Sequence, residues 1–128
     1  MMYLMEAIRD FEGKAHDMVG LFPGEAVMQR SGLIMGYREL EIVTPCVLGS
    51  PGLRARGHEF HYSCLKNHPS LEYACMVTDA RGRRKGQDGL LRGNVLALYT
   101  HLHFASQPQL ARSLLACARE RKVGRKED

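Results

Sequence analysis

The 128-residue sequence lacks the features that mark membrane, secreted and repeat proteins. No run approaches the ~20 apolar residues that a membrane-spanning helix needs. The N-terminal stretch has no basic segment followed by an apolar segment and a small-residue cleavage site. There is no internal repeat and no low-complexity segment. We therefore expect one domain of a cytoplasmic protein that has no membrane partner.

Close cysteine pairs are also absent. The four cysteines include no C-x-x-C spacing of the kind found in zinc knuckles and redox motifs, so we expect small buried hydrophobic residues. No cysteine or serine stands in a G-x-C-x-G or G-x-S-x-G elbow between a strand and a helix. The residues alone therefore reveal no nucleophile.

The formal net charge of +4 could indicate an anionic partner. Much of the excess, however, lies in the RGRRK stretch at 81–85 and in the C-terminal RERKVGRKED. Basic clusters in a turn and at a chain end are usually solvated, so no nucleic-acid partner is expected. Residues 120–128 are predicted to be a basic, flexible tail.

Alternation of apolar and polar residues predicts several strands and an α/β architecture. Residues 18–26 look like the end of a buried strand entering a turn, and 80–89 looks like a basic turn. The remaining predicted strands are 34–44, 53–63, 70–79 and 94–104, of which the last has the strongest pattern.

Helices are predicted near both ends of the chain. Residues 3–10 have apolar residues at helical spacing but no capping residue in front of them. A second helix is predicted from Ser106, which has Gln109 at capping-box spacing and Pro108 in the first turn. Its apolar stripe, expected to cover one face of a sheet, consists of Leu110, Leu114, Leu115 and Ala118.

The most informative polar residues are His101 and His103, two apart at the end of the 94–104 strand. A period of two places both imidazoles on one face, together with Tyr99. They could be core histidines bonded to the backbone, or could chelate a metal with His58, His61 and His68, although the spacing fits no specific zinc pattern. Either could also be a catalytic base, because imidazole accepts protons near neutral pH.

A second polar pair lies on the predicted strand 53–63. The period of two puts His58, Phe60 and Tyr62 on one face and Glu59 with His61 on the other. Glu59 and His61 could be a surface pair, or part of a pocket rim that orients a polar ligand.

Four strings taken together are similar to a known family. MVGLFPGEAVM, GYRELE, RGHEFHYS and RGNVLALYTHLHFAS resemble, in order and with natural spacing, the C-terminal part of cobyrinic acid a,c-diamide synthases. They also resemble the related family that amidates nickel sirohydrochlorin. The resemblance covers about residues 1–119. It implies the C-terminal segment of a class I-like glutamine amidotransferase domain of the cobyric-acid-synthase type, with a flavodoxin-like layered sheet and flanking helices.

The resemblance also implies roles for individual residues. His101 matches the family's general base, which takes the proton of a cysteine nucleophile. His103 stands where many class I amidotransferases have a glutamate, so a dyad assisted by another group is more consistent with this sequence than a strict triad. Glu59 and His61, in a strand that the family keeps near its active site, are assigned a supporting or glutamine-side role.

The family's nucleophile lies in a run like Glu-Cys-Gly-Gly followed closely by Met-Tyr-Leu, and Met2, Tyr3 and Leu4 match that continuation. The resemblance thus implies a fragment without the leading strands and nucleophile elbow, inactive alone. In the complete ligase of cobalamin biosynthesis, glutamine supplies ammonia for amidation of the a and c carboxylates of a corrinoid. ATP and Mg²⁺ belong to the missing N-terminal synthetase domain, and no cofactor or metal is expected in this segment. The alternative from another class is a non-catalytic binding or interaction module with the same fold.

Overall fold

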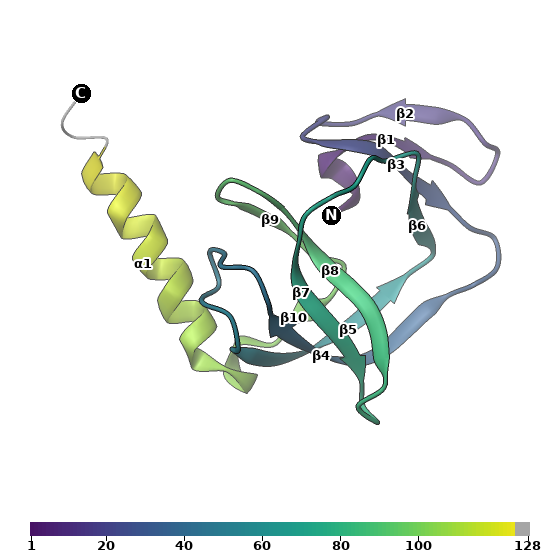
Figure 1. The fold of residues 1–128 in the computed structure, drawn as a ribbon. Coiled ribbons are helices and arrows are strands. Elements are labelled where there is room, and N and C mark those ends of the chain that lie inside the picture. Colours follow the sequence, from purple (N-terminus) through teal and green to yellow (C-terminus); the bar gives the residue numbers. More distant parts are fainter. Residues whose placement is uncertain (125–128) are drawn as a thin grey trace.

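The computed structural model describes residues 1–124, which form two β-sheets and one α-helix in this part of the chain (Figure 1). The smaller sheet has the strand order β2-β1-β3-β6, and the larger has the order β10-β5-β4-β7-β8-β9. The smaller sheet consists of β1 (Met5–Arg9), β2 (Ala15–Asp17), β3 (Phe22–Met28) and β6 (Ser63–Lys66). The larger sheet consists of β4 (Ile34–Ile42), β5 (Arg54–His61), β7 (Tyr73–Asp79), β8 (Arg84–Arg92), β9 (Val95–Ala97) and β10 (His101–Leu102). The helical elements are the 3₁₀ turns η1 (Met2–Leu4) and η2 (Phe104–Ser106) and the helix α1 (Pro108–Gly124).

The architecture is mixed α/β, as the sequence predicts, but it is not the layered arrangement of a flavodoxin-like sheet. Among the described strands, β1 and β3 pair in parallel and the other pairings are antiparallel. The connections between consecutive strands of the larger sheet are too short to carry the crossover helices that parallel strands require. The flanking helices expected from the resemblance are represented within residues 1–124 only by α1.

Three of the predicted strands are confirmed as β4, β5 and β7 in the larger sheet. In β4, Leu40 and Ile42 are buried while Glu39 and Glu41 are more exposed, which is the alternation that the sequence pattern requires. The segment 18–26, predicted to be a strand end entering a turn, instead contains the start of β3, which begins at Phe22 and continues through Pro23 and Gly24 to Met28.

The predicted N-terminal helix over 3–10 is wrong. Only the short turn η1 is helical, and β1 follows it with Met5 and Ala7 buried on one side. The alternating burial has a period of two, which is that of a strand. Parallel pairing with β3 provides hydrogen-bond partners for the backbone of this segment. A short run of apolar residues fits either period, and tertiary pairing decided it.

The predicted continuous strand over 94–104 is also wrong, although both of its ends are extended. It divides into β9 and β10, with a bend at residues 99 and 100. The bend has a physical cause, because the Asp88 carboxylate accepts the backbone N–H groups of Tyr99 and Thr100. The predicted turn over 80–89 is too long, since β8 already begins at Arg84.

The helix α1 is confirmed, but it begins at Pro108, two residues after the predicted start, and Ser106 is not its cap. Ser106 lies in η2, and its hydroxyl instead bonds to the backbone N–H and carbonyl of Arg56. Leu110 is buried, whereas Leu114 and Leu115 are 39% and 57% exposed, so the apolar stripe covers the sheet only at its first turn. Figure 1 shows α1 standing to one side of both sheets.

The extent of α1 bears on the predicted tail at 120–128. The helix continues to Gly124, so the first part of that segment is helical, while residues 125–128 lie outside the described residues. Within residues 1–124, no helix has the length and apolar character needed to cross a membrane.

Two groups of buried side chains hold the sheets in place. One packs the larger sheet against Leu48 and against Leu110 of α1. The other joins Met5, Phe22 and Ala26 of the smaller sheet to Leu90 and Ala97 of the larger one. The second group fixes the smaller sheet over one face of the larger sheet. The opposite face remains open, and this difference determines the surroundings of each predicted site residue.

Candidate active site

The strand β5 carries polar side chains to both faces of the larger sheet. Ala55 and Gly57 are buried on the covered face, and the alternation places Glu59 and His61 on that side. Arg56, His58 and Phe60 belong to the open face. The prediction that Glu59 and His61 share a face opposite His58 and Phe60 is therefore confirmed.

On the covered face, Glu59 is the centre of a polar cluster. Its carboxylate accepts hydrogen bonds from Arg38 Nε at 2.6 Å and from His61 Nε2 at 2.9 Å. Arg38 is only 8% exposed, so the ion pair is well shielded from water. The hydrogen bond from His61, followed by the bond and charge of Arg38, holds the pKa of Glu59 below its ordinary value despite partial burial.

Both ring nitrogens of His61 are engaged. Nδ1 lies 2.8 Å from the carbonyl oxygen of Ser63, and Nε2 faces the Glu59 carboxylate. A carbonyl and an ionised carboxylate can only accept, so each ring nitrogen of His61 faces an acceptor. Both nitrogens are therefore held by the protein, and His61 offers no unengaged ring nitrogen in this arrangement.

Tyr99 completes the cluster. Its ring stacks on His61 with centroids 3.8 Å apart and planes 17° apart, and its hydroxyl lies 2.8 Å from the Ser63 hydroxyl. Ser63 in turn donates to the sulfur of Met2 at 3.4 Å. Burial raises the pKa of Tyr99, so its hydroxyl stays protonated near neutral pH. The cluster therefore ties β5, β6 and the bend before β10 together.

His101 lies at the edge of the other face. It pairs directly with His58 in the ladder between β10 and β5, and directly opposed residues share a face of a sheet. Its Nδ1 donates to the carbonyl oxygen of His58 at 3.3 Å. Since a carbonyl needs a donor, Nδ1 carries a proton, and Nε2 is the ring nitrogen that could accept one. Among the described residues, Nε2 has no hydrogen-bond partner.

Glycine at position 57 permits this arrangement. A Cβ built on Gly57 would lie 2.5 Å from the His101 carbonyl oxygen and 2.8 Å from Thr100 Cγ2. Any side chain would therefore push β10 away from β5. The close approach of the two backbones fixes His101 at the sheet edge.

His103 is not brought into the same arrangement. β10 ends at Leu102, and His103 is the exposed residue that precedes η2. Its backbone N–H donates to the Arg56 carbonyl at 3.0 Å. Within residues 1–124, its side chain has no hydrogen-bond partner. The structure thus separates the predicted site residues, with His101 on the open face and Glu59 with His61 on the covered face.

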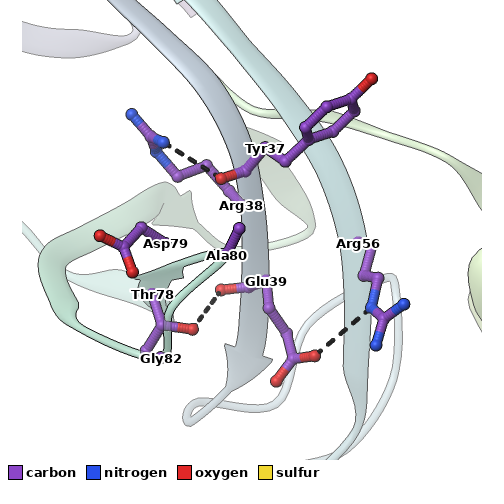
Figure 2. Close-up of a pocket in the computed structure, with 8 residues that line it drawn as sticks. All are labelled: Tyr37, Arg38, Glu39, Arg56, Thr78, Asp79, Ala80 and Gly82. Carbon is purple, nitrogen blue, oxygen red and sulfur yellow. Dashed lines mark hydrogen bonds and ion pairs between the residues drawn. The ribbon is translucent and has the colours of Figure 1, made fainter.

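A hollow of about 500 Å³ lies on the open face beside the tip of the β7–β8 hairpin. Figure 2 shows the side chains of Arg56 and Glu39, two of its lining residues, pointing toward each other, with Thr78 on the other side of Glu39. Arg56 Nε lies 3.7 Å from Glu39 Oε2. The hollow begins at Tyr37, whose ring meets the ring of His58 edge to face at 5.6 Å. Tyr37 and His58 therefore lie between this hollow and His101.

The four cysteines offer little nucleophilic character in these surroundings. Cys75 is buried, and its burial raises the pKa of the thiol to about 12. Cys46, Cys64 and Cys117 are half-buried, so the prediction of small buried residues is confirmed only for Cys75. In the described part of the chain, no cysteine is hydrogen-bonded to an imidazole; the Cys64 sulfur accepts from Gln29 at 3.1 Å.

The metal-site alternative is not supported. Among residues 1–124, no three of the His, Cys, Asp and Glu side chains come together in a way that could hold a metal ion. His61 is engaged by acceptors, and His68 bonds to the Pro69 carbonyl.

Sequence reasoning missed Arg38, Ser63 and Asp88 as parts of the site and named Tyr99 only as a neighbour of the histidines. Arg38 sits at an inward position of an alternating strand, where a charge needs a partner, and that signal could have paired it with Glu59. Asp88 fell in a segment predicted as a turn, so nothing in the pattern indicated that its carboxylate is buried.

Comparison with known proteins identifies relatives of this chain by sequence. Residues 1–109 match the CobB/CobQ-like glutamine amidotransferase domain. The cobyrinate a,c-diamide synthase of Salmonella typhimurium is 37% identical over 120 residues, which are 93% of this chain and 26% of that protein. Its namesake in Dehalococcoides mccartyi is 36% identical over 118 residues, 90% of this chain and 25% of the relative. That of Methanocaldococcus jannaschii is 35% identical over 128 residues, 88% of this chain and 29% of the relative.

The chain thus spans about a quarter of the length of the curated relatives it matches. The match covers both histidine-bearing strands, the Glu59 cluster and the open face. This protein therefore belongs to the family of CobB/CobQ-like glutamine amidotransferase domains.

Proposed function

We propose that this chain supplies the general base for glutamine hydrolysis in a cobyrinate a,c-diamide synthase. In the whole protein, the ammonia released from glutamine serves the ATP- and Mg²⁺-dependent amidation of the a and c carboxylates of a corrinoid. ATP and Mg²⁺ are bound by parts of that protein other than these residues. The support is the family match over residues 1–109 together with relatives of that name.

The observation that carries the proposal is the hydrogen bond from His101 Nδ1 to the His58 carbonyl. It leaves Nε2 as an acceptor, which is the state that a base requires. In the reaction, Nε2 takes the proton of a cysteine thiol while the thiolate attacks the glutamine side-chain amide. The same nitrogen then returns the proton to the departing ammonia, leaving a thioester that water hydrolyses.

His101 works as part of an assisted dyad in this proposal. The His58 carbonyl orients the imidazole from the Nδ1 side, which is the task of the glutamate in a Cys-His-Glu triad. His103 lies two residues after His101 and, within residues 1–124, makes no hydrogen bond to its ring, so its proposed role is confined to supporting the site. Glu59 and His61 support the site indirectly by holding Tyr99, two residues before His101.

Glutamine is proposed to bind in the hollow on the open face. An α-amino acid needs an anionic group for its ammonium and a cationic group for its carboxylate. Glu39 and Arg56 offer both, and their 3.7 Å separation is a loose ion pair that a ligand can open. The hollow and His101 lie on the same side of the larger sheet, so the side-chain amide can extend toward the base.

The nucleophile is proposed not to be any of the four cysteines of this chain. Cys75 is too buried to form a thiolate at neutral pH, and no other cysteine within the described residues bonds to His101. The isolated chain is therefore expected to show no glutaminase activity. A rate that disappears in His101→Ala would show instead that the chain holds its own nucleophile.

The proposal is tested by placing this chain in the Salmonella typhimurium relative in exchange for the matching segment. Amidation of cobyrinate is then measured with glutamine and, separately, with ammonium salts as nitrogen source. His101→Ala is expected to lower the glutamine-dependent rate by roughly 10²-fold or more, the usual effect of a lost general base. The ammonia-dependent rate should not change, because it bypasses glutamine hydrolysis.

The matched control is His68→Ala, which removes an exposed imidazole away from both faces of the site. It should leave both rates unchanged. Glutamine-dependent amidation that survives His101→Ala would refute the proposed role. A chimera that uses ammonia but never glutamine would favour a non-catalytic module.

A further inference from the structure

Asp88 has surroundings that no part of the proposed reaction explains. It lies in the middle of β8 and is only 5% exposed. Within the described residues it forms no ion pair, and its carboxylate instead accepts three backbone N–H groups. Oδ1 accepts from Gly89 at 2.7 Å and from Tyr99 at 3.1 Å, while Oδ2 accepts from Thr100 at 2.9 Å.

Two of these three donors belong to the residues immediately before His101. In a continuous strand, the N–H groups of Tyr99 and Thr100 would bond to a neighbouring strand or face solvent. Bonded to Asp88, they turn the chain inward between β9 and β10. Thr100 is consequently 3% exposed, and Tyr99 reaches the ring of His61.

The position of β10 is therefore set from two sides. Asp88 holds the residues before His101 from within the sheet, and Gly57 allows the His101 carbonyl to lie against the backbone of β5. The hydrogen bond from His101 Nδ1 to His58 depends on this placement, because the carbonyl of His58 is fixed in β5.

We propose that Asp88 is a positioning residue that holds His101 in the tautomer and orientation required of a base. The inference rests on the proposed function for the meaning of that tautomer, but the structural effect can be measured without any glutaminase activity. Asp88 does not contact the reacting atoms and acts only through the backbone of Tyr99 and Thr100.

The arrangement requires a carboxylate rather than an amide of the same shape. Asparagine has one oxygen and one NH₂ group. If its oxygen replaces Oδ1, the NH₂ faces the N–H of Thr100, donor against donor. If it is flipped, Gly89 and Tyr99 lose their acceptor. In either orientation at least one backbone N–H stays buried without a partner.

The test is Asp88→Asn in the 128-residue protein, followed by NMR of the ¹⁵N-labelled imidazoles and of amide hydrogen exchange. In the wild type, His101 is expected to be protonated at Nδ1. In the variant, this preference should be lost, giving a mixture of both tautomers. Exchange at the Thr100 amide should accelerate about tenfold, the equivalent of a hydrogen bond of about 1.4 kcal/mol.

Asp79→Asn is the matched control on the same hairpin. Asp79 Oδ1 also accepts two backbone N–H groups, those of Arg81 and Arg83, but they lie at the turn far along the chain from His101. One amide oxygen can keep both bonds, so the His101 signals should be those of the wild type. A general loss of stability would change the His101 signals in both variants. Loss of positioning would change the His101 tautomer only in Asp88→Asn.

An unchanged His101 tautomer in folded Asp88→Asn would overturn the proposal. If this variant does not fold, the wild type provides the test in a temperature series that ends below unfolding. The tautomer preference must then fade together with protection of the Thr100 amide, and a preference that outlasts that protection would overturn the proposal. Glutamine-dependent amidation that survives His101→Ala, combined with a changed His101 tautomer in Asp88→Asn, would refute the role of His101 as a base. It would leave the positioning of His101 by Asp88 intact.

Discussion

Histidine side chains on the two faces of the larger sheet have contrasting hydrogen-bond surroundings. On the covered face, both ring nitrogens of His61 face acceptors and its ring stacks on the half-buried Tyr99. On the open face, His101 has one side-chain hydrogen bond within residues 1–124, from Nδ1 to a backbone carbonyl. The first histidine is held by the protein on both sides, while the second leaves Nε2 without a partner among those residues.

This difference shows that hydrogen-bond partners, and not sequence context, decide what an imidazole can do. His58 and His61 are separated by two residues in one family signature, and His101 is cross-strand to the former. Burial strengthens the fixed network around Glu59, whereas the ring of His101 is exposed to solvent. Three substitutions can break or sharpen this comparison between the faces.

The largest effect is expected from Glu59→Gln. It leaves the Arg38 guanidinium without its counter-charge and the His61 ring without its carboxylate acceptor on the covered face. Removing one member of a shielded ion pair should lower the free energy of unfolding by about 3 kcal/mol at pH 7. Denaturant unfolding followed by circular dichroism measures this loss.

The pH dependence of that loss has a definite sign. The pKa of Glu59 is lowered in the folded protein, mainly by the hydrogen bond from His61, so its contribution is present above the unfolded-state pKa of about 4.3. It disappears as the pH falls through the lowered folded value, and wild type and variant should converge there. Glu39→Gln, on the open face with loose partners at 3.7 and 3.8 Å, should cost no more than about 0.5 kcal/mol. Equal losses in both variants would contradict the comparison.

An intermediate effect is expected from Gly57→Ala. The added methyl group would overlap the backbone of β10, and the resulting shift should cost about 2 kcal/mol of unfolding free energy. It should also weaken the bond between His101 Nδ1 and the His58 carbonyl, which the imidazole ¹⁵N shifts report. The rings of His61 and Tyr99 should keep their contact, because they stack from the covered side.

Gly82→Ala separates the overlap from ordinary backbone strain. Gly82 has a positive φ of +75° but open space where a Cβ would lie, so only strain of about 1 kcal/mol is expected. Its His101 signals should not move. Unchanged His101 signals in Gly57→Ala would mean that the close approach of β5 and β10 is not what fixes the open-face histidine.

Features that depend on neighbouring residues could be predicted from the sequence, whereas features that depend on contacts between distant segments could not. Strands β4, β5 and β7 and the two faces of Glu59, His61, His58 and Phe60 follow from a period of two. The division of the 94–104 strand does not, because it depends on Asp88, eleven residues before Tyr99 and on another strand. A hydrogen bond between a side chain and a distant backbone leaves no periodic signal.

The same limit applies to the candidate site. The Glu59–His61 pair could be named because both residues lie on one strand, but Arg38 and Tyr99 join it from elsewhere in the fold. His101 could be selected as a base only through the family resemblance. Its free Nε2 comes from a carbonyl on a neighbouring strand, which the sequence pattern cannot show.

The smallest effect is expected at Thr100, which links the two faces. Its neighbours in sequence are Tyr99 of the covered cluster and His101 of the open face, and it is 3% exposed. Within the described residues, its hydroxyl is a buried polar group without a hydrogen-bond partner. Thr100→Val removes that hydroxyl at nearly constant shape and keeps the backbone N–H that Asp88 accepts. The free energy of unfolding should therefore rise by about 1 kcal/mol, with His101 signals unchanged.

Thr78→Val is the counterpart on the open face, where the hydroxyl donates to the Glu39 carbonyl at 3.4 Å. This bond is long and half-buried, so its loss should lower stability slightly, the opposite sign to Thr100→Val. Chemical denaturation of both variants under one set of conditions compares the two signs directly. Destabilisation by Thr100→Val would mean that the hydroxyl finds an acceptor in solution. The bend at residues 99 and 100 would then depend on a hydrogen bond of the Thr100 hydroxyl as well as on the backbone N–H groups that Asp88 accepts. Changes on one face of the sheet would then reach the other face through Thr100.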